Sequence, residues 1–142
     1  MARVIIFLAL VFVASIAPCG AALAAPTASN GSTDQLVGDW RGRSLCVTTT
    51  RPACTDETVL YRISKDTPKG DAFHLAANKL VDGTFQSMGD ALTCKFEPTR
   101  QQLICPMGNS QWQFRWDGRK LFGALLQDGA AFRFIQVDKV KP

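Results

Sequence analysis

Apolar and polar residues alternate along most of the chain beyond residue 36, and the alternation is clearest in the range 110–137. There, aromatic residues occupy every second position up to an Asp-Gly pair at 117–118, and a second Asp-Gly pair follows at 128–129. A period of two is typical of strands with one buried face, and Asp-Gly pairs are typical of tight hairpin turns. The last third of the chain therefore predicts a three-stranded antiparallel meander.

Shorter runs with the same period precede this meander, and turn-forming residues separate them at regular intervals. They predict strands at 36–47, 57–64, 72–81 and 84–88, followed by a hairpin within 92–107. No stretch has the 3.6-residue period of an amphipathic helix of normal length. The fold class predicted is all-β: an antiparallel, lipocalin-like, up-and-down β-barrel of eight strands, or nine. Sequential hairpins favour this arrangement, and closure of the barrel removes exposed strand edges.

Two-residue turns at the two Asp-Gly pairs predict the register of the meander. Phe114 then lies opposite Leu121, and Gly123 leaves room for Trp112 and Phe134 on the neighbouring strands. One face is aromatic and points to the interior, with Trp112, Phe114, Trp116, Leu121, Leu125, Phe132 and Phe134. The opposite face carries Gln113, Arg115, Phe122, Leu126, Arg133 and Ile135.

Residues 1–24 have the organisation of a secretory signal peptide, with a basic start, an apolar run at 4–17 and a small-x-small site at 22–24. Cleavage is predicted after Ala24. The apolar run is shorter than the roughly 20 residues that span a membrane. A lipoprotein signal with Cys19 acylated is disfavoured by the proline before it. The sequence thus predicts a secreted or periplasmic protein whose mature chain has no membrane span.

The mature chain divides into a lead-in and one domain. Residues 25–35 are small and polar, which predicts disorder. Residues 36–140 then form the β-barrel domain, a length within the usual range for one domain.

Cysteine usage supports the exported location. Four cysteines remain after the signal peptide, namely Cys46, Cys54, Cys94 and Cys105. An even number in an exported chain predicts two disulfides. A hairpin with Cys94 opposite Cys105 puts its apolar residues on one side, pairing Phe96 with Leu103 and Leu92 with Met107. This register predicts the bridge Cys94–Cys105 and leaves Cys46–Cys54 by elimination. Both are expected to be structural, since neither has CxxC spacing.

Charge and chemistry-bearing residues exclude several functions. The whole chain has 16 basic and 12 acidic residues, a net charge of +4, and the basic residues are scattered rather than clustered. Nucleic-acid binding is therefore not expected. The single histidine, His74, is predicted to point outward, and it cannot form a zinc site with cysteines held in disulfides. Neither a phosphate-binding loop nor a nucleophile elbow is present. A small hydrolase that uses His74 is the least favoured alternative, and we expect no enzymatic activity and no cofactor.

The start of the domain, Leu36-Val37-Gly38-Asp39-Trp40, resembles the Gly-x-Trp start of the calycin group, which includes lipocalins, fatty-acid-binding proteins and avidins. The resemblance implies a barrel closed at one end by Trp40, often packed against an arginine of a late strand, with Arg133 as the candidate by position. Small exported bacterial metalloprotease inhibitors share the barrel and the Leu-x-Gly-x-Trp start, although their cysteine spacing differs. The chain also resembles exported bacterial proteins of uncharacterised function with this start and paired cysteines.

Two binding functions follow as expectations. The calycin resemblance implies carriage of a small hydrophobic molecule inside the barrel, with a lining of Trp112, Phe114, Trp116, Leu125, Phe132 and Phe134. These six side chains are also what a solid core requires, since eight strands leave an interior just wide enough for side chains or one small ligand. The packed core is the favoured interpretation. A filled barrel would instead indicate an inhibitor or binding partner of an exported protein.

Overall fold

A computed structural model describes residues 33–48, 53–67 and 70–141, and the predicted signal peptide lies outside them. The described chain has one short 3-10 helix, η1 (Thr33–Leu36), which begins in the predicted lead-in and ends at the first residue of the predicted domain. The strands that follow are β1 (Gly38–Cys46), β2 (Glu57–Lys65), β3 (Ala72–Val81), β4 (Thr84–Ser87), β5 (Leu92–Glu97), β6 (Gln102–Met107), β7 (Ser110–Trp116), β8 (Lys120–Gln127) and β9 (Ala130–Lys139).

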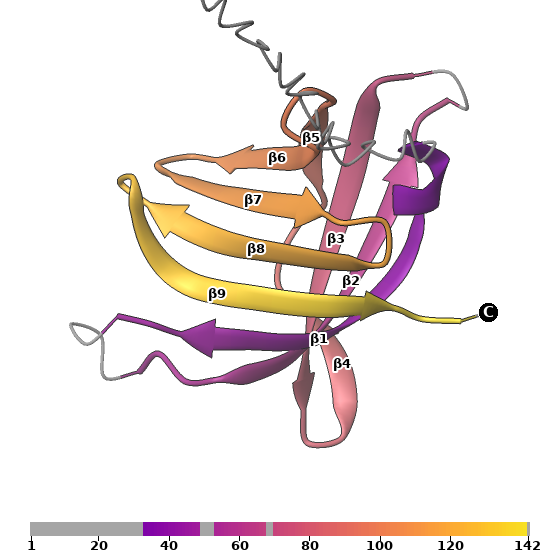
Figure 1. Ribbon diagram of the computed structural model, residues 1–142. Coiled ribbons are helices and arrows are strands. Elements are labelled where there is room, and N and C mark those ends of the chain that lie inside the picture. Colours follow the sequence, from indigo (N-terminus) through magenta and orange to yellow (C-terminus); the bar gives the residue numbers. More distant parts are fainter. Residues whose placement is uncertain (1–32, 49–52, 68–69, 142) are drawn as a thin grey trace, which may run out of the picture.

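Eight of these strands close into an antiparallel barrel, so the predicted fold class is confirmed. Neighbours in the sheet follow the order β2, β1, β9, β8, β7, β6, β5 and β3, and a further pairing of β2 with β3 completes the ring. Figure 1 shows β6 to β9 stacked in sequence, with β1 beside β9 and with β2 and β3 crossing behind. Only β1–β9 joins strands distant in the chain, because every other pairing but β3–β5 connects consecutive strands.

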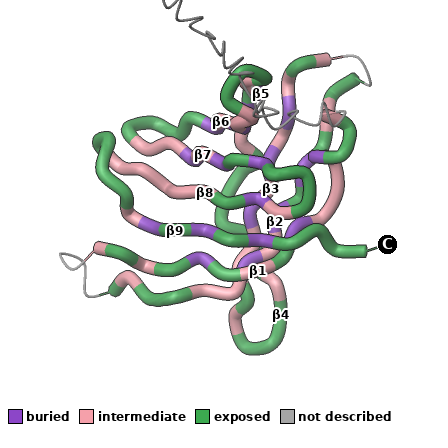
Figure 2. The backbone as a smooth tube through the Cα atoms, in the orientation of Figure 1, coloured by how far each residue is buried: buried purple, intermediate pink, exposed green. Residues whose placement is uncertain are grey.

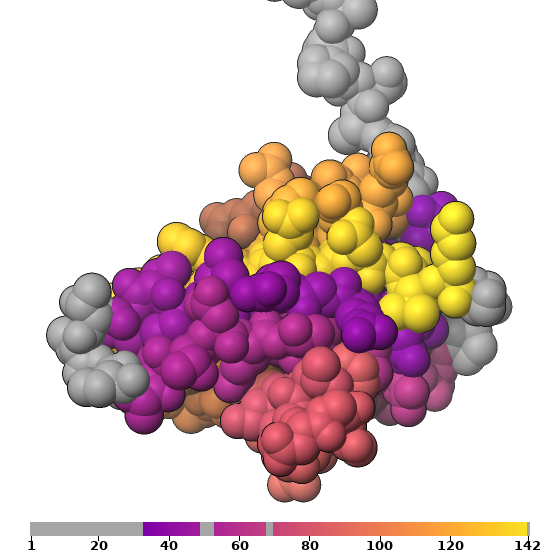
Figure 3. Space-filling view, turned by 90° about the horizontal axis from the view of Figure 1, so that it is seen from below, coloured from indigo at the N-terminus to yellow at the C-terminus, as the bar shows by residue number. Residues whose placement is uncertain are grey.

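The remaining described strand, β4, lies outside the ring. It pairs with the second half of β3, whereas the first half of β3 pairs with β5. Asp82 and Gly83 form the tight turn between β3 and β4, both with positive φ (48° and 80°), as the Asp-Gly pair predicted. Figure 3 shows this hairpin (salmon) projecting from the barrel next to atoms of β1. The Arg41 guanidinium of β1 lies 5.3 Å from the centre of the Phe85 ring of β4.

The core consists of the inward side chains of all eight ring strands. Figure 2 shows buried positions alternating with exposed ones along β7 and β9, as strands with one wet face require. The largest fully buried side chains are Trp40, Tyr61, Phe73 and Phe114. Leu36 of η1 is also fully buried, so the helix joins the core at one end of the barrel.

Both predicted disulfides are present. Cys94 and Cys105 join β5 to β6, with Cα atoms 4.1 Å apart, and Cys46 and Cys54 close the loop between β1 and β2, with Cα atoms 5.8 Å apart. The predicted pairing of Phe96 with Leu103 is confirmed. Met107, expected on the same buried side, is instead 44 % exposed at the end of β6. The bridges indicate an oxidising, extracellular-type environment.

The β7–β8 register differs from the predicted one by two residues. Trp116 pairs with Leu121 and Phe114 pairs with Gly123, so residues 117–119 join the two strands, three residues rather than the predicted two. The cause is Asp117, whose carboxylate Oδ1 accepts hydrogen bonds from the backbone N–H groups of residues 119 and 120, at 2.8 and 2.7 Å. An Asx-type turn of this kind needs the longer loop. A shift of two residues keeps every side chain on its predicted face.

The β8–β9 register contains a bulge, and this overturns the predicted face of β9. The two-residue turn at Asp128-Gly129 forms as predicted and pairs Gln127 with Ala130, but an irregularity between Leu125 and Leu126 then shifts the pairing by one residue. A one-residue slip moves each following side chain to the other side of the sheet. Side chains at 133, 135 and 137 therefore point inward, and those at 134 and 136 point outward.

Candidate functional site

Three of the six residues predicted to line an interior ligand site are core residues. Trp112, Phe114 and Trp116 of β7 are at most 5 % exposed. The Tyr61 ring of β2 packs edge-on against Trp112 and Phe114, with ring centres 5.2 and 5.6 Å apart. Gly123 allows this packing from the other side, because a Cβ at that position would lie 2.6 Å from the Phe114 ring. Gly123 therefore makes room for Phe114 rather than for Trp112 and Phe134.

The other three predicted residues lie at or beyond the bulge. Leu125 is partly buried against the core and Phe132 is half-buried. Phe134 was expected inside, and that expectation is wrong: its side chain points outward and is 53 % exposed. The six residues therefore do not line one interior site.

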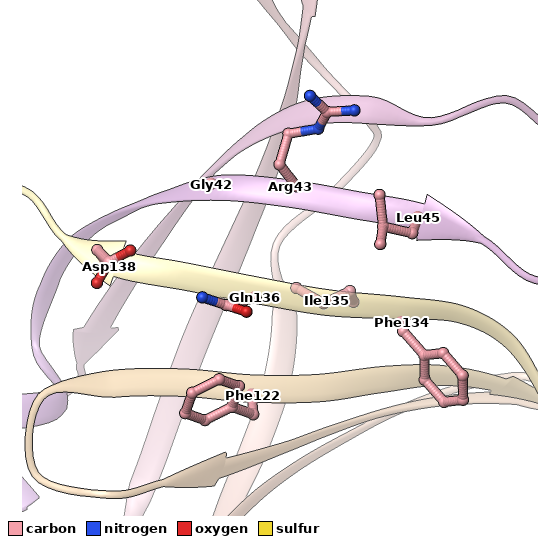
Figure 4. A pocket seen from close by; sticks show the side chains of 8 residues that line it. All are labelled: Gly42, Arg43, Leu45, Phe122, Phe134, Ile135, Gln136 and Asp138. Carbon is pink, nitrogen blue, oxygen red and sulfur yellow. The ribbon is translucent and has the colours of Figure 1, made fainter.

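Phe134 instead belongs to a groove on the outer face of the barrel. The groove crosses β1, β9 and β8, has a volume of about 550 Å³ and is lined by Gly42, Arg43, Leu45, Phe122, Phe134, Ile135, Gln136 and Asp138. Figure 4 shows Phe122 on β8 and the Phe134 side chain reaching from β9 over β8 farther along, with Leu45 and Arg43 on the neighbouring β1. Phe122 and Leu45 are 40 % and 42 % exposed, so the groove presents three large apolar side chains to solvent. We refer to this surface as the outer groove.

Charged and amide side chains continue the surface on both sides of the outer groove. One row across four strands runs Arg43, Gln136, Phe122 and Arg115, from β1 through β9 and β8 to β7. At about 4.8 Å per strand, the Cα atoms of the two arginines are roughly 14 Å apart. The Arg43 side chain is 61 % exposed and its guanidinium lies 3.7 Å from Asp56. Arg115 is also exposed.

A second cluster, polar and buried, lies inside the barrel around Arg133. Its guanidinium donates from Nη1 to the carbonyl and the hydroxyl of Ser44, both at 3.1 Å, and from Nη2 to the Thr55 carbonyl at 2.8 Å. Nη1 also lies 3.2 Å from the Glu57 carboxylate, which in turn has the Lys79 ammonium at 3.5 Å. Arg133 thus ties β9 to β1, β2 and the loop held by Cys46–Cys54. It was expected on the outer face, and the bulge is the reason that it is buried.

Tyr61 and Trp112 border this cluster. The Tyr61 hydroxyl and the Trp112 indole N–H are buried and make no hydrogen bond with the described residues. Burial raises the pKa of Tyr61 above its ordinary value, and the nearby Ser44 hydroxyl, which lies outside hydrogen-bond geometry, offsets only part of this effect. The phenol is neutral and, like the arginine cluster, serves the packed interior.

The cation that packs on the Trp40 ring is a different residue from the arginine that the calycin resemblance implies. Trp40 is 1 % exposed and its indole N–H donates to the Leu36 carbonyl at 2.8 Å, which closes one end of the barrel. The cation over its ring is Lys139, with Nζ 5.4 Å from the ring centre. Arg133 pairs with Cys46, six residues along β9 from Lys139, so it lies toward the other end. The expected role of Arg133 is therefore wrong.

Groups with catalytic chemistry are sparse in the described part of the chain. His74 is partly exposed on β3, and its Nε2 lies 2.6 Å from Asp66, an exposed pair at the surface. Residues 33–48, 53–67 and 70–141 contain no group of three or more His, Cys, Asp or Glu residues that could hold a metal ion. Within the same residues, no helix has the length and apolar character required to cross a bilayer.

Sequence reasoning missed the outer groove because it predicted Phe134 to be core. One signal was available: Phe122 and Leu126 were predicted on the outer face, so that face was not wholly polar. Comparison of the chain with protein-family models and with curated proteins finds no match.

Proposed function

We propose that this protein is a non-enzymatic binding module that binds an exported partner protein through the outer groove. The observation that carries the proposal is the outward position of Phe134, half exposed beside Phe122 and Leu45 in a hollow of about 550 Å³. The Phe134 ring has no polar atom that burial would deprive of water, yet the bulge holds the ring in solvent. Clustered, exposed large apolar side chains are typical of interaction sites on soluble proteins.

The composition around the groove also favours a protein partner. Protein interfaces are enriched in aromatic residues and arginine and depleted in lysine and glutamate. The surface around Phe122 and Phe134 has Arg43 and Arg115 at its sides, with the amide of Gln136 between them.

Carriage of a small hydrophobic molecule is the second candidate, and the size of the outer groove favours it. The volume of about 550 Å³ lies in the range of roughly 300–1,000 Å³ that is usual for small-molecule sites. On this alternative the ligand would lie on the outer wall, because Trp112, Phe114 and Trp116, predicted to line an interior site, are packed in the core.

The test uses a photo-reactive phenylalanine analogue at position 134, with the exported fraction of the source organism. We expect one stoichiometric cross-linked protein from position 134 and none from the same analogue at Lys95, an exposed residue on β5. Phe134→Ser should abolish capture by the unmodified chain, whereas Lys95→Gln should retain it. Absence of any protein cross-link at 134 would refute the proposal, and a co-purifying apolar molecule detected by native mass spectrometry and lost in Phe134→Ser would favour the second candidate.

A further inference from the structure

We infer that the partner presents an acidic surface around an apolar anchor, a conclusion that rests on the proposed function and specifies the partner's chemistry. The apolar centre of the site, formed by Leu45, Phe122 and Phe134, has an exposed arginine at each end of the row that crosses it. A partner that inserts an aliphatic or aromatic side chain between the phenylalanines brings its flanking residues over Arg43 and Arg115. Carboxylates are the groups that guanidinium binds with two parallel hydrogen bonds.

The charges on this face sum to a positive value. Besides the two flanking arginines, the neighbouring outward positions carry Lys120 and Arg41, and the anionic groups are Asp138, Asp56 and, beside Lys120, Asp117. Asp138 lies 3.2 Å from the Lys120 ammonium, so its charge is compensated within the chain. The Arg43–Asp56 pair is long, at 3.7 Å, and its side chains are 61 % and 50 % exposed, and such pairs contribute little stability. Arg43 is therefore available to a partner.

A second copy of the chain does not fit this charge pattern. The whole chain has a net charge of +4, and stacking two copies of the face would oppose arginine with arginine. Like charges brought together across an interface cost several kcal/mol.

Nucleic acid fits less well than protein. Duplex and single-strand binders neutralise many phosphates, on the order of 6–10 for a typical site, with a continuous basic stripe. Arg43 lines the outer groove at one side and Arg115 lies beside Phe122 at the other, and Asp138 lies within the groove. An acidic protein surface matches two well-separated cations with an apolar patch between them.

The experiment selects partners without bias from a phage library of random 12-residue peptides, using the wild-type chain as bait and Phe134→Ser for counter-selection. We expect the selected peptides to contain an aromatic or aliphatic residue flanked by Asp or Glu. Affinity of a selected peptide should fall about threefold to tenfold in Arg43→Gln and in Arg115→Gln, and should fall as salt screens the flanking pairs. The matched control Lys95→Gln removes one charge from β5 and should leave affinity unchanged. Circular dichroism and thermal midpoints verify that each variant is folded.

The outcomes separate this inference from the proposed function. Peptides that depend on Phe134 but are neutral or basic, or that bind equally well to both arginine variants, overturn the acidic partner and leave the binding site standing. Absence of any Phe134-dependent peptide overturns both. A dimer in sedimentation that Phe134→Ser dissociates would assign the face to a second copy, and displacement of the peptide by a single-stranded oligonucleotide would assign it to nucleic acid. Either result contradicts the acidic protein partner.

Discussion

Replacement of Arg133 by methionine tests the bulge that defines the outer groove. In the structure Arg133 is 7 % exposed and its guanidinium lies 3.2 Å from Glu57, whose side chain is 17 % exposed. Removing one partner of a buried ion pair costs about 3–5 kcal/mol, because the other charge stays buried. Lys79 remains 3.5 Å from Glu57, so we expect the lower end, about 3 kcal/mol. Phe134→Ser changes a half-exposed ring and should cost below about 1 kcal/mol.

Plain alternation without a bulge predicts the opposite pair of results. Arg133 would then be a surface residue whose replacement costs within roughly 0.5 kcal/mol, and Phe134 would be a core residue whose loss costs about 3–5 kcal/mol. The two variants therefore distinguish the registers without any knowledge of the partner.

The assay is urea unfolding at neutral pH with the disulfides intact, with free energies obtained by linear extrapolation. Arg115→Met is the matched control, since it removes an exposed arginine from the outward face of β7 and should be nearly neutral. Adding Glu57→Gln to Arg133→Met should recover part of the lost stability, because the uncompensated charge is gone. If Phe134→Ser were the more destabilising of the two variants, the bulge and the outer groove would both be wrong.

Two further predictions concern the β7–β8 hairpin. Gly123→Ala should destabilise the chain by about 1–3 kcal/mol in the same unfolding assay, because its Cβ would lie 2.4 Å from the Gln113 carbonyl and 2.6 Å from the Phe114 ring; a neutral effect would contradict this close packing. Hydrogen bonds from the backbone N–H groups of Lys120 and Arg119 lower the pKa of Asp117 below its ordinary value of 3.8. The charge of Asp117 therefore contributes stability that is complete above the pKa of the unfolded state and is lost as pH falls through the lowered pKa of the folded state. Asp117→Asn should flatten the dependence of unfolding free energy on pH below about pH 4. An unchanged dependence in this acid range would contradict the turn.

Much of the fold could be predicted from the sequence because the determining interactions are local. The Asp82-Gly83 and Asp128-Gly129 turns form between adjacent strands, and their positive φ angles follow from the residue types. The pairing of Cys94 with Cys105 followed from the requirement that one hairpin place its apolar residues on one side. Both depend on residues fewer than a dozen positions apart.

The candidate site could not be predicted in the same way. The parity of β9 depends on its pairing with β1, where Leu45 lies opposite Phe134, and these residues are far apart in the chain. When both faces of a strand carry apolar residues, alternation does not decide which face is buried. In β9 one face has Phe132 and Phe134, and the other has Ile135 and Val137. The sequence pattern alone favours an interior position for the two phenylalanine rings.

The sequence by itself determined an all-β antiparallel chain, the tight turns at Asp82-Gly83 and Asp128-Gly129 and the two disulfides, because strand period, turn chemistry and cysteine pairing act over short distances. Only the tertiary structure decided which side of β9 faces the core. Closure against β1 places Ile135 and Val137 inside, and the buried guanidinium of Arg133 is compensated there by Ser44, Thr55 and Glu57, groups brought from distant strands and loops. That closure leaves Phe134 on the outer wall.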